Sequence, residues 1–179
     1  MLNSDFKIKY VKRLRGHSSY VTHVDWSEDN RLLQSTCGSH EILYWDVAAG
    51  TQLLSSADCV EGDTNWHTET CEIGFSVMGI WGGGTQKVTD VNAVDVSRDM
   101  PREAAKSSAG ALVATGDDRG RLQVFNYPCV VRAAPSLKCK GHSSHVLCAK
   151  WIHPVGDEAF VVTAGGNDCS AIVWAAKPL

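Results

Sequence analysis

The sequence lacks the features that mark several large classes of protein. Its 179 residues contain no run of 18 apolar residues, so we predict no membrane-spanning helix. The first 16 residues hold no apolar core of signal-peptide length, and we expect no secretion signal. The formal net charge is only −3, without the basic excess of a dedicated nucleic-acid-binding protein. Neither a membrane nor a nucleic acid is therefore an expected partner.

The cysteines also lack a recognisable pattern. There are seven, an odd number, and no two are separated by the two residues of a Cys-x-x-Cys pair. This favours reduced thiols in a cytosolic protein over a disulfide framework or a cysteine metal site. What the sequence does contain is glycine and tryptophan, with 16 and 6 residues, scattered among short apolar segments. This composition is typical of a turn-rich all-β protein.

An internal repeat organises the chain. The hexapeptide GHSSYV at 16–21 recurs as GHSSHV at 141–146, and a Trp follows each copy at the same distance, as Trp26 and Trp151. The copies lie 125 residues apart, close to three times the period of about 40–45 residues of a four-stranded propeller blade. A middle copy is therefore expected, and residues 90–97 and 112–125 supply it, with Phe125 in the place of a Trp.

Alternating apolar and polar residues within these copies predict strands that present one set of side chains to each face of a sheet. The predicted fold is all-β, with three four-stranded blades forming a partial propeller. We place the blades at about 16–55, 86–140 and 141–174, and an inter-blade linker at 56–85. Residues 1–15 are predicted to supply an outer strand, at about 9–14, to a preceding or closing blade, because no outer strand follows Trp174.

Two levels of resemblance follow from these residues. A Gly-His pair near the start of a unit and Trp45-Asp46 near its end resemble the WD-repeat signature. The linker sequence WHTETCEIGFSVMGIW at 66–81 is more specific. With ATGDD at 114–118, FNYPC at 125–129 and GHSSHV at 141–146, it resembles the echinoderm microtubule-associated protein-like family over nearly the whole chain.

The resemblance to this family implies microtubule association, a cytoplasmic and cytoskeletal location (microtubules, spindle or cilium), and no enzymatic activity. The expected function is a non-enzymatic protein-interaction scaffold, the C-terminal propeller fragment of a microtubule-associated protein, with proteins and possibly tubulin as partners. The alternative is a general WD-repeat adaptor of another complex that does not bind microtubules.

The WD-repeat resemblance also implies a structural role for the histidines. In such repeats the His joins a buried hydrogen-bond network with a turn Asp, a Ser or Thr of the second strand and the Trp of the third strand. The first blade offers only part of this set, because Ser39 stands in place of the turn Asp, and the middle blade has no His. The predicted network residues are His17, Ser35, Trp45, His142, Thr163, Asp168 and Trp174.

The sequence gives weaker support to a metal site or a catalytic site at these and neighbouring residues. His142 and His145 have the spacing of a metal-ligand pair, but no further ligand stands at diagnostic spacing. The sequence Asp117-Asp118-Arg119-Gly120 fits a tight hairpin turn better than a calcium or catalytic carboxylate pair. We find no convergent catalytic set, so no catalytic residue, metal or cofactor is predicted.

Partners are expected at the Gly-His loops and at the turns between second and third strands. The candidate contact residues are Ser18, Ser19, Tyr20, Asp117, Asp118, Arg119, Ser143, Ser144 and His145. Five cations at 7–15 could meet an acidic tubulin tail, although a solvated outer strand is the simpler interpretation.

Three blades cannot close a ring. The chain is therefore expected to be a fragment of a longer protein, half of a ring that another chain completes, or a subunit that pairs with itself. Linker residues Trp66, Phe75 and Trp81 are expected to be buried between blades, and the polar insert at 97–111 to form a surface loop.

Overall fold

The computed structural model describes residues 8–54, 64–82, 89–97, 111–155 and 158–176. Lys7, nearly all of the predicted surface insert and parts of the linker lie outside the described residues. Strands make up most of the described chain, and they form three antiparallel sheets. None of the described helices is long and apolar enough to cross a membrane.

The first blade is a four-stranded sheet in sequence order. It consists of β1 (Val21–Trp26), β2 (Leu32–Cys37), β3 (Ile42–Asp46) and β4 (Thr51–Leu53). Each strand pairs with the next by a short antiparallel connection, as period-2 alternation predicts for a meander. The predicted all-β blade is confirmed here.

The second blade repeats this order. Its strands are β5 (Val91–Val96), β6 (Leu112–Asp117), β7 (Arg121–Asn126) and β8 (Leu137–Lys140). The turn between β6 and β7 contains Gly120 at φ +72°, a conformation that favours glycine.

The third blade has three strands within the described chain. Its sheet has the order β9 (Val146–Val155), β10 (Glu158–Gly165) and β11 (Ala171–Ala176). The expectation of three four-stranded units therefore holds for two blades, and the third lacks an outer strand beside β11.

Residues 8–15 form no strand in this chain. Their large side chains are strongly exposed, with Tyr10 at 71% and Val11 at 80%. The Lys12 ammonium group donates hydrogen bonds to the backbone carbonyls of Ala48 and Ala49, beside the turn before β4. A role of this segment as the outer strand of a preceding or closing blade stays a prediction.

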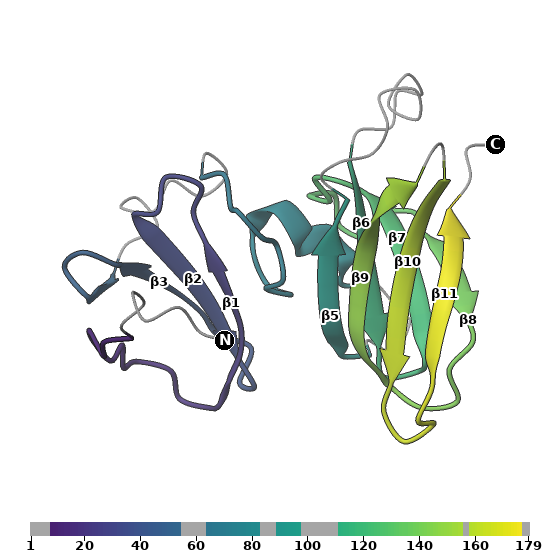
Figure 1. The fold of residues 1–179 in the computed structure, drawn as a ribbon, viewed down its shortest axis with the longest axis horizontal. Coiled ribbons are helices and arrows are strands. Elements are labelled where there is room, and N and C mark those ends of the chain that lie inside the picture. Colours follow the sequence, from purple (N-terminus) through teal and green to yellow (C-terminus); the bar gives the residue numbers. More distant parts are fainter. Residues whose placement is uncertain (1–7, 55–63, 83–88, 98–110, 156–157, 177–179) are drawn as a thin grey trace.

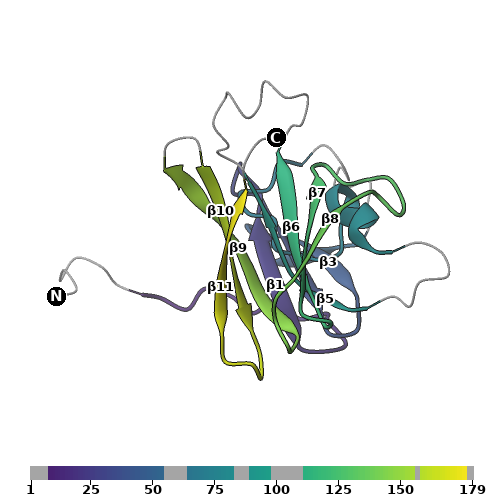
Figure 2. The ribbon, with the colours of Figure 1, turned by 90° about the vertical axis from the view of Figure 1, so that its right-hand side faces the viewer.

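The second and third blades lie face to face, whereas the first blade stands apart from them (Figure 1). Strand β9 packs against β5 and β6, and Figure 2 shows the third sheet, β9 to β11, beside the second. The 3-10 helix η1 (Phe75–Ile80) of the linker lies between the first and second blades. The linker is thus a packed element of the fold.

A buried apolar cluster joins η1 to the second blade. Val77 and Ile80 of η1 pack with Val94, Val113 and Phe125, all of them at most 4% exposed. The backbone of Gly79 donates to the carbonyl oxygen of Cys129 (2.7 Å). A Cβ atom on Gly79 would lie 2.4 Å from the carbonyl oxygen of Val131, so this close approach requires glycine.

The linker aromatics differ in burial. Trp66 is buried at 8% exposure and stacks on Tyr44, with 6.2 Å between ring centroids. Trp81 is half-buried and meets the ring of His40 edge to face. Phe75 is 48% exposed, so the expectation that it is buried was wrong, because η1 directs Val77 and Ile80 into the core instead.

Candidate functional site

The third blade holds a chain of four hydrogen-bonded side chains. His142 Nδ1 lies 2.7 Å from Asp168 Oδ2, and His142 Nε2 lies 2.8 Å from Thr163 Oγ1. Trp174 Nε1 donates to the same Thr163 oxygen at 2.8 Å. With the Nδ1 proton of the histidine directed at Asp168, Thr163 donates to Nε2 and accepts from Trp174, so both ring nitrogens, the hydroxyl and the indole N–H are satisfied.

This arrangement resembles a nucleophile, base and acid in series, but it cannot act as one. Thr163 is completely buried and His142 is 2% exposed, so no substrate carbonyl can reach the hydroxyl. Both ring nitrogens already have partners. The network instead fixes the Gly-His loop to β10 and β11.

Asp168 is adapted to this role. Burial alone would raise the pKa of its carboxyl group, but hydrogen bonds from His142 and from the side chain and backbone of Ser170 outweigh that effect. The net pKa is lowered, and the carboxylate also accepts from the backbone amide of Ser143 (3.2 Å). The ionised Asp168 therefore holds the start of the Gly-His-Ser-Ser loop.

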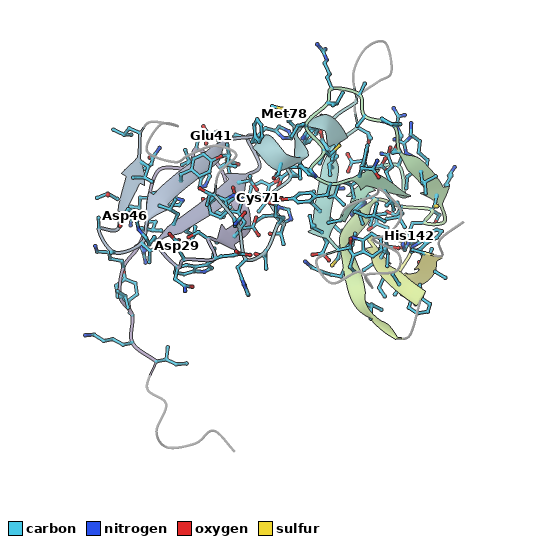
Figure 3. All side chains as sticks on the ribbon, turned by 90° about the horizontal axis from the view of Figure 1, so that it is seen from above. Asp29, Glu41, Asp46, Cys71, Met78 and His142 are labelled. Carbon is cyan, nitrogen blue, oxygen red and sulfur yellow. The ribbon has the colours of Figure 1, made fainter. Side chains whose placement is uncertain are left out.

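The first blade has a related but altered network. His17 Nε2 lies 2.7 Å from Ser35 Oγ, and Trp45 Nε1 donates to that same oxygen at 2.8 Å. The carboxylate comes from Glu41, whose Oε2 accepts from the backbone amide of Ser18 (3.0 Å), as Asp168 does from Ser143. That hydrogen bond is the largest cause that lowers the pKa of Glu41. Figure 3 labels Glu41 in the first blade and His142 in the third.

The sequence search missed Glu41 because of its spacing. Asp168 stands six residues before Trp174, whereas Glu41 stands four residues before Trp45. The longer Glu side chain reaches the loop from a position at the start of β3. An acidic residue anywhere in the turn, and not at one fixed spacing, would have been the useful signal.

The middle blade replaces the histidine network by an ion pair. Phe125 is buried and has no N–H group to donate, so the Thr115 hydroxyl has only the Gln123 carbonyl, at 3.5 Å. Asp117, at the end of β6, is completely buried and is 2.7 Å from both Nε and Nη2 of Arg121. Asp117 is thus a structural residue, and its prediction as a partner contact was wrong, because Arg121 and the turn amides enclose its carboxylate.

The remaining predicted contact residues lie in the Gly-His loops and the turns beside them, which we together call the Gly-His rim (loops 16–20, 38–41, 118–120 and 141–145). The backbone of Gly38 donates to the carbonyl of Tyr20 (3.0 Å), joining the two loops of the first blade. A Cβ on Gly120 would lie 2.3 Å from the carbonyl oxygen of His142, so the middle turn abuts the loop of the third blade. The exposed rim residues are Ser18, Tyr20, Asp118, Arg119 and Ser143.

Ser19, Ser144 and His145 are only half-buried members of this rim. Ser144 Oγ lies 3.1 Å from His145 Nδ1 and accepts from the backbone amide of Asn167 (3.2 Å). These two side chains brace the turn between β10 and β11. They can therefore shape the rim, while the more exposed positions offer free contact area.

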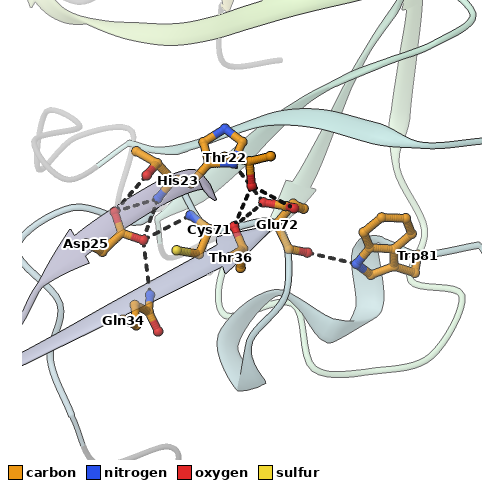
Figure 4. A network of polar contacts seen from close by, with 9 residues as sticks. Thr22, His23, Asp25, Gln34, Thr36, Cys71, Glu72 and Trp81 are labelled. Carbon is orange, nitrogen blue, oxygen red and sulfur yellow. Dashed lines mark hydrogen bonds and ion pairs between the residues drawn. The ribbon is translucent and has the colours of Figure 1, made fainter. Parts of the chain in front are cut away.

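A second polar network, missed from the sequence, ties the linker to the first blade (Figure 4). The carboxylate of Asp25, completely buried in β1, accepts from the amides of Thr70 and Cys71, the hydroxyls of Thr68 and Thr70, and the side chain of Gln34. Burial, followed by the charge of Asp25, raises the pKa of the Cys71 thiol well above its ordinary value. Cys71 is thus a protonated core residue.

Glu72 extends this network. Its Oε2 accepts from Thr36 (2.8 Å) and lies 2.8 Å from Nδ1 of His23, and its backbone carbonyl accepts from Trp81 Nε1. Burial raises the pKa of Glu72, but the contacts with His23, with its own backbone amide and with Thr36 outweigh it and lower the net pKa.

The three antiparallel sheets follow one another in repeats, and in the first and third a histidine and an indole share the oxygen of one buried hydroxyl group. These are features of a WD-repeat β-propeller. The chain belongs to the echinoderm microtubule-associated protein family. The family model that matches, over residues 2–176, describes the second β-propeller of the echinoderm microtubule-associated protein.

Individual relatives agree with this family. The chain is 39% identical over 163 residues to human echinoderm microtubule-associated protein-like 4, covering 90% of this chain and 15% of that protein. It is 40% identical over 168 residues to the human like 2 protein, covering 94% and 23%. For the mouse like 3 protein the identity is 39% over 162 residues, covering 90% and 16%. This chain thus spans less than a quarter of the length of these relatives.

Proposed function

We propose that this chain is a non-enzymatic protein-interaction scaffold whose partners bind the Gly-His rim. The observation that carries the proposal is that some residues of the rim are buried and fix its loops, while others are exposed and available to a partner. The His17 and His142 networks fix the loops from the blade side, while Tyr20, at 76% exposure, and Arg119 are exposed. Preformed loops lose little conformational entropy on binding, and Tyr and Arg are the side chains enriched at binding hot spots.

The finer proposal is that the partner is the microtubule, in the cytoplasm and its cytoskeleton. The names of the relatives support it, since all three are called echinoderm microtubule-associated protein-like. The four cations Lys9, Lys12, Arg13 and Arg15 are all exposed beside the first blade and would attract an acidic polypeptide.

Co-pelleting of the purified chain with microtubules tests both levels, at low and at physiological salt. We expect Tyr20→Ala and Arg119→Ala each to weaken binding about 10-fold, or about 1.4 kcal/mol. Lys138→Ala, at an exposed position on the outer strand β8, is the matched control and should bind like the unchanged chain.

The outcomes separate the two levels of the proposal. Absence of pelleting at both salt concentrations removes the microtubule and leaves the general adaptor. Pelleting that is lost with salt and is unaffected by either rim variant assigns binding to the basic segment and contradicts the rim. Completion of the ring by another chain or a second copy is read separately, from the mass in sedimentation.

A further inference from the structure

The first blade contains a cluster of three potential metal ligands that the third blade does not reproduce. His17, Cys37 and Glu41 each offer one ligand atom, and these atoms all lie within 4.8 Å of one another. They come from three different places in the blade: the Gly-His loop, the end of β2 and the start of β3. A shared ion would add a further link between segments that the pairing of β2 with β3 and the His17–Ser35 hydrogen bond already hold together.

The comparison with the third blade shows how the cluster arises. Cys37 occupies the strand position of Gly165, since Ser35 and Thr163 hold equivalent places in the two networks. A Cβ on Gly165 would lie 1.9 Å from Asp168 Oδ1 and 2.5 Å from His142 Nδ1. The absence of a side chain at Gly165 is therefore what lets Asp168 reach the histidine. In the first blade Cys37 fills that space, and the carboxylate stands further off.

The consequence is an unpartnered buried histidine nitrogen. The His17 side chain is only 6% exposed, and its Nδ1 has no hydrogen-bond partner among the described residues. Glu41 Oε2 is 3.8 Å from this nitrogen, too far for a hydrogen bond, whereas the equivalent distance in the third blade is 2.7 Å. Leaving a buried polar atom unsatisfied costs free energy, so this nitrogen is a vacant donor to an ion.

Two of the three distances between ligand atoms come close to those of a tetrahedral zinc site, and the third, between His17 and Cys37, is at most 4.8 Å. Bond lengths of about 2.3 Å to sulfur and about 2.0–2.2 Å to nitrogen or oxygen place two ligand atoms of a tetrahedron roughly 3.4–3.6 Å apart. Cys37 Sγ lies 3.4 Å from Glu41 Oε2, and His17 Nδ1 lies 3.8 Å from the same oxygen. We propose that His17 Nδ1, Cys37 Sγ and Glu41 form a site for a borderline-soft divalent cation of the zinc class, with the fourth position open to water.

The surrounding hydrogen bonds already orient two ligands. Ser35 holds His17 through Nε2, which leaves Nδ1 as the nitrogen that faces the cluster, and the Ser18 amide holds Glu41. Coordination requires the Cys37 thiol to release its proton to solvent. It also requires a neutral His17 whose one ring proton is on Nε2, where it is donated to Ser35 Oγ, so that the lone pair of Nδ1 can bind the ion. The side chain of Glu41 is 40% exposed, so the ion can enter from the rim.

The test is a titration of the full chain after dialysis against a chelator. We expect one equivalent of Zn²⁺ to bind in competition with a chromophoric indicator, and Co²⁺ to give a thiolate-to-cobalt charge-transfer band. Cys37→Ala should abolish the band, and Glu41→Gln should weaken Zn²⁺ binding more than about 10-fold, since even orienting residues around metal ligands contribute that much. Cys169→Ala, at an exposed cysteine of the third blade, is the control and should change neither readout.

The negative results are equally defined. A Co²⁺ complex without a charge-transfer band, or Zn²⁺ affinity that is unchanged in a folded Glu41→Gln variant, overturns the proposal. Near-ultraviolet circular dichroism checks the folding of each variant, and Glu41 is exposed enough for its substitution to leave the blade intact. Because the test uses no partner protein, it is independent of the proposed scaffold function.

Discussion

The two joints between consecutive blades use the same strand position in different ways. Asp25 of β1 and Asp95 of β5 stand at equivalent places in their repeats. Asp95 accepts from the backbone amide of Trp151 (2.7 Å) and from Lys150 Nζ (2.6 Å), both in the next blade. Asp25 accepts instead from Thr70 and its linker neighbours. The same strand position therefore binds the third blade in one joint and the linker in the other.

The difference shows what the linker replaces. Ser27 forms a β-bridge with Trp66, and the His67 amide donates to the carbonyl of Trp26 (2.6 Å), so the linker lies along β1 as a neighbouring strand segment would. The far side of the linker carries Val77 and Ile80 into the core of the second blade. The second and third blades contact each other directly, whereas the first and second blades are joined through this linker.

The first and largest prediction concerns the two aspartates. Asp25→Ala removes a buried carboxylate that accepts several hydrogen bonds and leaves the Thr70 and Cys71 amides without their partner. We expect it to lower the free energy of unfolding by about 3 kcal/mol. Asp95→Ala breaks a joint whose carboxylate is 16% exposed, and whose Lys150 is 50% exposed, so the expected loss is about 1 kcal/mol. Urea denaturation followed by tryptophan fluorescence measures both.

Equal losses for the two variants would contradict the comparison. Thr68→Val offers a milder check on the same joint, because it removes one hydroxyl donor to Asp25 and keeps the side-chain volume. Its expected cost is about 1 kcal/mol.

The second prediction uses the natural variation among the blades. Phe125 of the middle blade occupies the place of Trp45 and Trp174, so a phenylalanine is compatible with this strand position. Trp45→Phe and Trp174→Phe each remove an N–H donor to the buried hydroxyl and some apolar volume. We expect losses of about 2 kcal/mol in each blade by thermal or urea denaturation. A cost near zero in both would show that the indole hydrogen bond contributes nothing to the blades.

The backbone plan was accessible from the sequence, and particular side chains show why the rest was not. The repeat of GHSS and the alternation through Val24, Val94 and Val124 predict strands, which is a local property of the chain. The bonding of Asp25 to Thr70 depends on the path of a linker more than forty residues away, which no periodicity encodes. From its place beside a Gly-containing turn, Asp117 was expected to be exposed. It is buried because Arg121, on the other strand of the hairpin, neutralises its charge, and no sequence pattern indicates that ion pair.

The contact surfaces at the ends of the chain illustrate the same limit. Trp26 in β1 is 41% exposed and Val173 in β11 is 63% exposed, although both are apolar strand residues. Alternation predicts that such residues face a neighbouring sheet, but it does not say that the neighbour belongs to the same chain. Because blades bury their apolar sides against each other, packing of another blade or of a second copy against these faces stays a prediction.

The last and smallest effect is the pH dependence of the first joint. The folded state lowers the pKa of Glu72, so the ionised form contributes stability above the pKa of the unfolded chain, and this contribution is lost as the pH falls through the folded pKa. Glu72→Gln keeps the shape and removes that titration. The variant should be less stable at neutral pH, and its stability should fall less steeply between about pH 5 and pH 3.

Urea midpoints measured across this range provide the comparison, with Glu28→Gln, an exposed glutamate of the same blade, as the control. An identical pH slope in Glu72→Gln and the unchanged chain would mean that the linker is held on the first blade by its backbone contacts and by Asp25 alone.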